Sequence, residues 1–214
     1  MSAKQYKDLV GLRNLVFAEG VKDDGSTFEA GFWNELEGAV SGDVAYEESN
    51  EARYRDNRVI DGTFTEGPDT ATFMMDILAN KVRAKLEGRT YSATNDVLIK
   101  TPKKKNQWFV VGGIKTFSDG SESAFIMYKT TVTAGNDTYE TKANSVTYQT
   151  KDYVFTGVYT NTKIATDEDG NKTFAKSVEV PLSDKVTEAK LFGTFEDGIS
   201  EVKPLTPDAI VALA

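Results

Sequence analysis

The stretch that decides the fold is QWFVVGGIKTFSDGSESAFIMYKTTVTA, residues 107–134. Two runs rich in β-branched and aromatic residues, 107–117 and 121–134, flank the turn sequence Ser118-Asp119-Gly120. An Asp-Gly pair between such runs is typical of a tight hairpin turn of the type I′ kind, because glycine accepts a positive φ without strain. The sequence therefore predicts an antiparallel β-hairpin over these residues.

Two adjacent glycines, Gly112 and Gly113, interrupt the first of these runs. They lack the spacing of a phosphate-binding loop, and no Gly-Lys-Ser/Thr sequence follows them. A glycine inside a strand weakens it, and it often marks a bulge or a close approach by a neighbour. We therefore expect either a bulge or close packing of a helix at this position.

Shorter runs along the rest of the chain have the composition and alternation of strands. They cover residues 12–19, 58–66, 70–77, 145–150, 153–160, 172–180 and 189–195. The turn sequence Gly67-Pro68-Asp69 separates the second run from the third, so these two are expected to pair antiparallel. The pattern indicates about eight to ten strands, at a spacing typical of a sandwich or barrel.

One segment has the spacing of a helix. Val82 and Leu86 lie four residues apart, and Gly88 stands where a glycine commonly follows the last turn. Asn80 is the expected N-cap, with Asp76 as the alternative if the helix begins a turn earlier. A helix this short is unstable alone, so it is expected to pack against the sheet.

The expected fold is mainly β with one flanking α-helix, a flattened β-barrel or sandwich with long loops and terminal arms, forming a single domain over residues 1–214. Three segments lie outside the regular pattern: residues 1–12 as a possible N-terminal arm, 26–51 as a long loop, and 196–214 as a C-terminal arm or short helix. In the last segment, Thr206 is the expected N-cap and Pro207 the first helical residue. Long loops without structure of their own are unusual in an isolated domain, which indicates that a partner orders them.

Composition excludes several kinds of function. The formal net charge of −8 is opposite to the cationic surplus that nonspecific DNA binding requires. The chain has no cysteine and no histidine, which removes disulfides, thiolate metal sites, cysteine nucleophiles and the usual general base. No cofactor is expected. The N-terminal residues lack a secretory pattern and no apolar run reaches the ~20 residues of a membrane span, so a chain that stays in the cytoplasm is expected.

Three polar motifs have a functional and a simpler structural interpretation. The carboxylates of Asp61 and Glu66, or of Asp56 and Asp61, could act as acid and base on a glycan, although 33 acidic residues make such pairs inevitable. The DEDGN sequence at 167–171 hints at a calcium loop, but its glycine stands fourth instead of sixth, and a plain β-turn explains it. The run Lys103–Lys105 is shorter than a nucleic-acid patch and suits a soluble loop tip or a contact with an acidic neighbouring subunit.

Several segments follow one another along the chain in a characteristic order. They are GLRNLVFAE at 11–19, YRDNRVIDG at 54–62, KLEG at 85–88, the VLIKTP segment at 97–102 with the hairpin after it, and SVTYQTKDYVFTG at 145–157. In this order they resemble the major tail proteins of long-tailed, non-contractile phages that infect Gram-positive bacteria. The resemblance spans residues 9–160, about two thirds of the chain. The chain departs from the family at the lysine run, and residues 161–214 resemble it only weakly.

The resemblance implies a structural virion protein, not an enzyme, that assembles in the host cytoplasm into stacked, hexameric rings forming the tail tube. Its implied partners are other copies of itself, a tape-measure protein in the lumen, the tail terminator and the distal tail proteins. DNA would pass through the lumen without specific binding, and the acidic net charge is compatible with that.

The stretch ARYRDNRVIDGTFTEG at 52–67 alternates cations and anions, which suits a surface that meets a copy of itself, because opposite charges can set register and orientation. The candidate residues for a subunit contact or the lumen wall are Arg55, Asp56, Arg58, Asp61, Lys103, Lys104 and Lys105. Two further classes of function stay open: a carbohydrate- or receptor-binding β-module, which requires exposed aromatic residues on one face, and a carboxylate-dependent hydrolase. A secretion-system tube protein of similar fold is the nearest structural alternative.

Overall fold

The computed structural model describes residues 7–55, 58–102, 107–137 and 149–213. Strands dominate, and one of the three helices found in these residues exceeds five residues, which confirms the mainly β fold with one flanking helix. The first half contains β1 (Leu9–Asp23), β2 (Phe28–Ala30), β3 (Asn34–Glu35), β4 (Ala39–Ala45), β5 (Glu48–Arg55), β6 (Arg58–Glu66), β7 (Asp69–Met75), α1 (Asn80–Glu87), β8 (Thr90–Ser92) and β9 (Val97–Ile99). The second half contains β10 (Phe109–Phe117), β11 (Glu122–Ala134), β12 (Lys151–Gly157), β13 (Ala165–Thr166), β14 (Lys172–Thr173), β15 (Ser177–Pro181), α2 (Glu188–Phe192), β16 (Phe195–Glu196), β17 (Ile199–Ser200) and α3 (Pro207–Val211).

The predicted hairpin at 107–134 is present as β10 and β11. The amide of Phe117 donates to the carbonyl of Ser121 at 2.9 Å, and Gly120 has a φ of 79°. Asp119 does not have a positive φ, so the turn is a type I turn closed by a left-handed glycine instead of the expected type I′ turn. The hairpin prediction is therefore confirmed, with a different turn.

The two strands of this hairpin are buried on both faces, which explains their nearly unbroken apolar sequence. Residues 109–114 of β10 and 123–128 of β11 are all buried. Side chains point alternately to the two faces of a strand, so each of these strands contributes side chains to two separate cores. The barrel core contains Leu15, Phe17, Leu36, Ala71, Phe73, Met75, Leu78, Leu86, Phe109, Val111, Phe125, Met127, Val132, Tyr153 and Phe155. The second core contains Val16, Ala18, Ala30, Trp33, Val110, Ile114, Ala124, Ile126, Tyr128, Ile164, Ala175, Val186, Leu191, Phe192 and Ile210.

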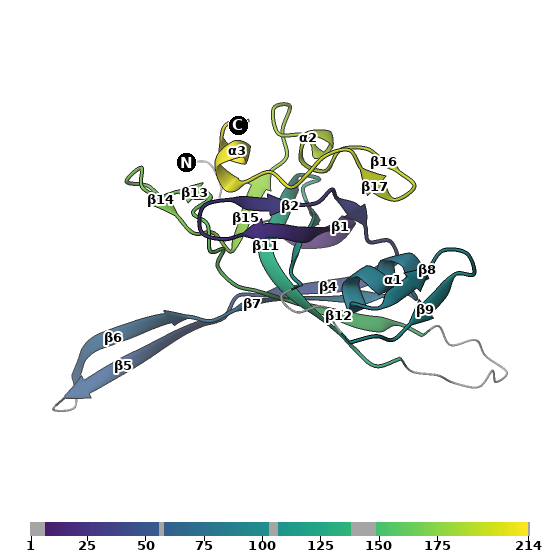
Figure 1. Cartoon of the computed structure of the whole chain (residues 1–214). Helices are drawn as coiled ribbons and strands as arrows, with labels where there is room; N and C mark the ends of the chain where they lie inside the picture. Colours follow the sequence, from purple (N-terminus) through teal and green to yellow (C-terminus); the bar gives the residue numbers. More distant parts are fainter. Residues whose placement is uncertain (1–6, 56–57, 103–106, 138–148, 214) are drawn as a thin grey trace.

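The sheet divides along β11, as Figure 1 shows. The first half of β11 pairs with β15, and its second half pairs with β12, which continues through β7 to β4. The sheet curls until β4 lies close to β1, where a Cβ on Gly42 would stand 2.7 Å from Leu12 Cδ2. The described residues of these two strands form no ladder with each other, so the barrel stays open along this seam.

Gly112 and Gly113 mark close packing, as expected, but against different neighbours from the predicted helix. A Cβ on Gly112 would lie 2.9 Å from the carbonyl oxygen of Phe125 and 3.2 Å from the ring of Phe192 in α2. A Cβ on Gly113 would lie 2.8 Å from Leu15 Cδ2. The strand needs glycine here because both of its faces are covered at once.

Helix α1 covers one end of the barrel core and ends at Gly88, whose φ is 65°. The prediction of this helix and its C-terminal glycine is confirmed, but the predicted N-cap is wrong. Ala79 occupies the N-cap position without a side-chain hydrogen bond, and Asn80 is the first helical residue. The side-chain amide Nδ2 of Asn80 instead donates to the backbone carbonyl of Asp96 at 2.9 Å, which links the helix to the turn before β9.

The strand predicted at 189–195 is wrong, because most of these residues belong to α2, whose N-cap Thr187 accepts a hydrogen bond from the amide of Lys190. Two further sequence predictions fail because strand pairing comes from distant parts of the chain. The stretch 26–51, expected as a long loop, contains β2, β3, β4 and the start of β5. β4 is exposed along most of its length, so it carries no alternating pattern, and it forms by pairing with β7. β6 and β7 do not pair with each other as expected, because β6 pairs with β5 and β7 lies between β12 and β4.

The described residues near both ends of the chain pack against the body and do not form free arms. Of residues 1–12, those from Leu9 onward belong to β1 and pair with β10, and residues 1–6 lie outside the described residues. At the C-terminus, the predicted short helix is present as α3, with Thr206 accepting a hydrogen bond from the amide of Ala209 and Pro207 in the first turn. Ile210 of this helix is buried in the second core.

Residues 161–213, which resemble the tail family only weakly, cover the second core. The indole Nε1 of Trp33 donates to the carbonyl of Leu191 at 3.0 Å, and the Trp33 ring meets Phe192 edge-on at 5.5 Å. Arg13 on β1 pairs with Glu188 of the same layer and with Glu122 of β11, which links this layer to the sheet. This segment is therefore an integral layer of the fold.

Candidate functional site

The feature that stands furthest from the body is the hairpin of β5 and β6, which we call the arm (residues 48–66). Figure 1 shows it extending away from the sheet on the side opposite α1. In the described residues β5 and β6 pair only with each other. Strands of this length reach about 25–30 Å. A two-stranded hairpin is marginally stable in water by itself. An arm that pairs with no other strand of the described chain is therefore expected to be stabilised by a partner.

The described strands of the arm contain three of the seven residues expected at a subunit contact. Arg55 lies opposite Arg58 at the end of the ladder, and Asp61 lies opposite Arg53. A register shift between Arg53 and Tyr54 indicates a bulge near this end. The other four expected residues, Asp56 and Lys103–Lys105, lie outside the described residues. The structure therefore brings Arg55, Arg58 and Asp61 onto one projecting element.

The base of the arm is fixed to the body. The amide of Gly67 donates to the carbonyl of Glu47 at 2.7 Å, and Lys176 Nζ donates to the carbonyl of Gly67 at 2.8 Å. Lys176 also pairs with Glu66 at 3.3 Å and lies 4.7 Å from the ring centroid of Tyr159. The Tyr159 hydroxyl donates to Glu66, and this hydrogen bond raises the pKa of Tyr159 to about 12. The same contact lowers the pKa of Glu66, the opposite of what a catalytic general acid requires.

The base of the arm also borders a hollow of about 320 Å³. Three partly exposed aromatic side chains line it: Tyr46, Tyr159 and Phe174. By contrast, Trp33 is completely buried and Trp108 is half-buried beside Phe28, so neither tryptophan offers an open stacking surface. Aromatic side chains on one face are the feature that a carbohydrate-binding module would need.

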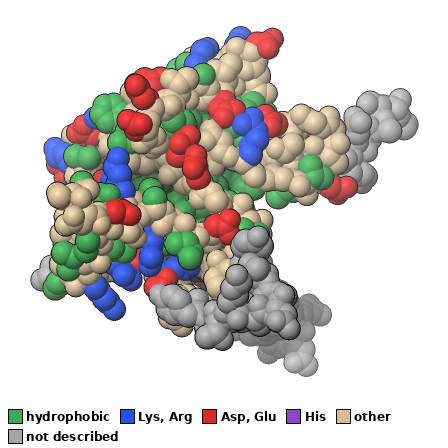
Figure 2. Space-filling model, turned by 90° about the vertical axis from the view of Figure 1, so that its right-hand side faces the viewer, with side chains coloured by type: hydrophobic (Ala, Val, Ile, Leu, Met, Phe, Trp, Pro, Cys, Tyr) green, Lys and Arg blue, Asp and Glu red, His purple; other side chains and the backbone are tan. Residues whose placement is uncertain are grey.

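A second hollow, of about 500 Å³, lies on the opposite side of the body, between the start of α1, β3 and the turn that joins β16 to β17. We call it the acidic pocket because its lining includes Glu35, Glu37, Asp76 and Asp197, together with Lys81, Lys85 and Ile77. Figure 2 faces this side of the molecule and shows acidic side chains spread among apolar ones. Sequence analysis did not single out these residues. The Asp-Gly pair at 197–198, a common hairpin turn, was the one local signal for the pocket's rim.

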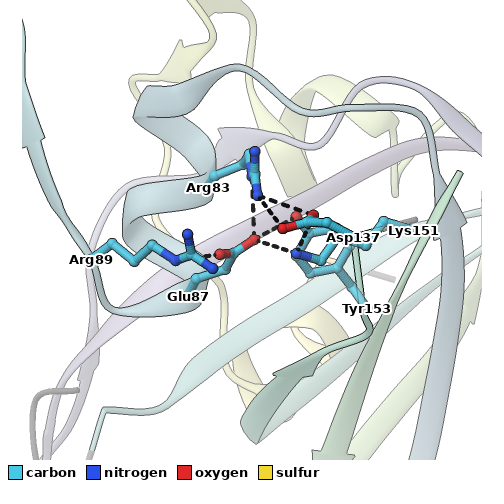
Figure 3. Close-up of polar contacts among 6 residues, drawn as sticks. All are labelled: Arg83, Glu87, Arg89, Asp137, Lys151 and Tyr153. Atoms are coloured by element: carbon cyan, nitrogen blue, oxygen red, sulfur yellow. Dashed lines mark hydrogen bonds and ion pairs between the residues drawn. The ribbon is translucent and has the colours of Figure 1, made fainter. Parts of the chain in front are cut away.

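Beneath α1 lies a buried group of charged side chains, which we call the ion cluster and which Figure 3 shows. Glu87 Oε1 accepts hydrogen bonds from Lys151 at 2.9 Å and from the Tyr153 hydroxyl at 3.1 Å. Arg89 Nε lies 2.6 Å from Glu87 Oε2, and Arg83 Nε lies 3.3 Å from Oε1. The spacing of Arg83 and Glu87, four residues apart on a helix, was the only sequence signal for this cluster.

The pKa values in the ion cluster follow from this geometry. Burial by itself would raise the pKa of Glu87, but the hydrogen bond from Lys151 and the nearby guanidinium groups hold this pKa below its usual value. The hydrogen bond from Lys151 likewise lowers the pKa of Asp137. Burial and the adjacent Glu87 carboxylate raise the pKa of Tyr153, so its hydroxyl stays protonated and donates. The cluster joins α1 to β12 as a permanent ionic contact.

The DEDGN motif forms a turn. The Asp167 carboxylate accepts hydrogen bonds from the amides of Asp169 and Asn171, and the turn joins β13 to β14. The described ranges contain no group of three or more side chains placed to hold a metal ion. In the same ranges, no helix is long and apolar enough to cross a membrane.

Comparison with known proteins assigns no family to the chain. No protein-family model matches it, and no curated protein matches it either. The resemblance to phage tail proteins thus stays a prediction from the sequence, and the function has to be argued from the surfaces described above.

Proposed function

We propose that this chain is a structural subunit that assembles with copies of itself into stacked, hexameric rings, forming the tail tube of a long-tailed phage. The observation that carries the proposal is the arm. It places a charged, two-stranded element about 25–30 Å long where only another molecule can cover it. The rest of the fold packs around two cores and provides the body from which the arm extends.

Other features support self-assembly. The outward edge of β4 is unpaired in the described part of the chain, and the strand is exposed along most of its length. Unpaired strand edges readily accept another strand, and soluble proteins usually protect them. Stable assemblies commonly bury 2,000 Å² or more per contact, on the order of what an arm and a strand edge can provide together.

The remaining parts of the proposal follow from the resemblance. The tube would enclose a tape-measure protein, meet the terminator and distal tail proteins at its ends, and conduct DNA without holding it. A net charge of −8 per subunit is compatible with this, since a cationic wall would bind the phosphate backbone.

Electron microscopy of the purified chain tests the proposal, with a variant in which residues 49–65 are replaced by Asn-Gly. The pair Glu48 and Glu66 already faces across the ladder, so a two-residue turn can join them without disturbing the base. The wild type is expected to form rings or tubes. The shortened variant is expected to keep the melting temperature of the wild-type body but to stay monomeric. Wild-type protein that stays monomeric at every salt and protein concentration, also when tail-tip proteins are added, would contradict the proposal.

The hollow at the arm's base favours one second candidate, a carbohydrate- or receptor-binding module. Tyr46, Tyr159 and Phe174 could stack on a sugar ring, with the carboxylate of Asp69 as a hydrogen-bond acceptor. A glycan array separates the two functions. The binding module would be favoured over the tube if the wild type does not assemble but binds a specific glycan, and if Tyr46→Ala loses that binding.

A further inference from the structure

The acidic pocket has more negative than positive charge, and the excess has no partner among the residues that the structure describes. Its four carboxylates face two lysines, a formal charge of −2. In the described part of the chain, none of these carboxylates has a cation within ion-pair distance, although fifteen other ion pairs form there. Burial, and then the neighbouring Glu37, raise the pKa of Glu35. A cation entering this pocket would relieve that repulsion.

The pocket also exposes apolar surface. The side chain of Ile77 is 75% exposed and that of Ile199 is 37% exposed, beside the carboxylates. A surface with both features fits arginine better than lysine or a metal ion, because the arginine stem covers apolar atoms while the guanidinium pairs with carboxylates. The expected occupant is therefore a segment rich in arginine.

The arm has such a segment at its outer end. Residues 53–61, which include Asp61 opposite Arg53, contain three arginines and two aspartates, a formal charge of +1 that is opposite in sign to the pocket's. The backbone places Arg55 and Arg58 opposite each other at the end of the ladder. The arm extends on the side of the body opposite α1 and the β16–β17 turn (Figure 1), which border the pocket, so the arm of one molecule cannot reach its own pocket.

We propose that the acidic pocket receives the arginine-bearing end of the arm from another copy of this chain. The inference rests on the proposed self-assembly and names its contact. Since the arm and the pocket lie on opposite sides, the contact is head-to-tail and leaves a free arm and a free pocket at the two ends. Such a contact propagates into a ring or a stack instead of closing into a dimer.

The hollow at the arm's base is the competing receptor. Its lining has four carboxylates, Glu47, Glu48, Glu66 and Asp69, and one lysine, Lys176, which lies 3.3 Å from Glu66 and 3.6 Å from Asp69. It also lies on the same side as the arm, so two molecules exchanging arms there would satisfy each other and form a closed pair. Head-to-tail stacking and closed dimers are distinguishable by experiment.

Charge exchange tests the proposal. The arm variant combines Arg55→Glu with Arg58→Glu, and the pocket variant combines Glu37→Lys with Asp76→Lys, two exposed carboxylates with no hydrogen bond to lose. Each variant alone is expected to lose assembly in microscopy and sedimentation, because like charges then meet. Their equimolar mixture is expected to regain it, because each arm then finds a pocket of opposite charge. Assembly by either variant alone at the wild-type level, or a mixture that stays monomeric while the wild type assembles, overturns the proposal.

Disulfide trapping tests the same contact when the wild type forms no visible tubes. The chain has no cysteine, so two single variants, Arg55→Cys and Glu37→Cys, can pair only with each other or with themselves. A mixture under mild oxidation is expected to form the mixed dimer, because a disulfide requires Cα atoms within about 7 Å. Glu168→Cys, on an exposed turn outside the pocket, is the matched control and should give only background dimer. If Arg55→Cys homodimers dominate, the arms of two molecules are exchanged in a closed pair. If the mixed dimer does not exceed the level of the control, the pocket is excluded as the receptor, and this conclusion does not depend on whether the protein forms a tube.

Discussion

Glu87 Oε1 lies 2.9 Å from Lys151 Nζ, and both side chains are almost completely buried between α1 and β12. Buried ion pairs add little net stability compared with an apolar contact, yet they are costly to break. This contact therefore fixes where the helix sits on the sheet. Lys81 and Lys85 of the same helix line the acidic pocket, so the contact also fixes one wall of the proposed receptor.

Replacing Glu87 with alanine is expected to destabilise the fold strongly. Lys151, Arg83 and Arg89 would lose their shared carboxylate, and Asp137, which pairs with Lys151 and Arg83, would be the one carboxylate left to them in the cluster. Removing one partner of a buried ion pair commonly costs about 3–5 kcal/mol. Urea unfolding followed by tryptophan fluorescence measures the loss. Glu29→Ala, which removes an exposed ion pair with Lys203, is the matched control and should leave the midpoint nearly unchanged. If both variants lowered the urea midpoint by a similar amount, the ion cluster would contribute no more to stability than an exposed ion pair.

Acid is expected to weaken the fold through the same cluster. The folded-state pKa values of Glu87 and Asp137 lie below their usual values of 4.5 and 3.8. A lowered carboxyl pKa gives stability that is present above the usual pKa and is lost as the pH falls through the folded-state pKa. The urea midpoint should therefore be flat near neutral pH and fall below about pH 4.5. Glu87→Gln should flatten part of this fall, and an unchanged slope would assign the acid sensitivity to other carboxylates.

Gly112→Ala is expected to destabilise the hairpin core by about 1–3 kcal/mol, the usual cost of an added methyl in a packed interior. The new Cβ would lie 2.9 Å from a backbone oxygen, that of Phe125, and neither strand can move without disturbing a core. Gly11→Ala is the matched control, since the nearest atom to its Cβ lies 3.7 Å away, at ordinary contact distance. Equal thermal stability of the two variants would show that β10 and β11 have room that the structure does not indicate.

The features that could be predicted from the sequence were those that depend on local patterns. The β10–β11 hairpin, the C-terminal end of α1 at Gly88 and the cap of α3 at Thr206 each follow from residues close together in the chain. Strand β4 could not be predicted, because its residues are exposed and only its pairing with β7 makes it a strand.

The candidate site shows the same division. The unusual charge of residues 52–67 singled out part of the arm as a candidate contact surface, and that role stays a prediction. The pairing partner of the strand at 58–66 was predicted on the wrong side, in β7 instead of β5. The acidic pocket was missed because its carboxylates come from three separate segments, around positions 36, 76 and 197. Only the folded sheet brings them together.

Phe192→Ala tests whether the C-terminal layer is part of the folding unit. The side chain is completely buried, contacts Trp33 edge-on and lies over Gly112, so its loss should leave a cavity that costs about 3–5 kcal/mol. Trp33 emission should shift to longer wavelength in the same variant, because water would approach its ring. Phe174→Ala removes the same side chain from a position that is 44% exposed and should cost far less. If Phe192→Ala unfolds with the wild-type midpoint, the layer formed by residues 161–213 folds independently of the sheet, and its contribution to the second core would have to be revised.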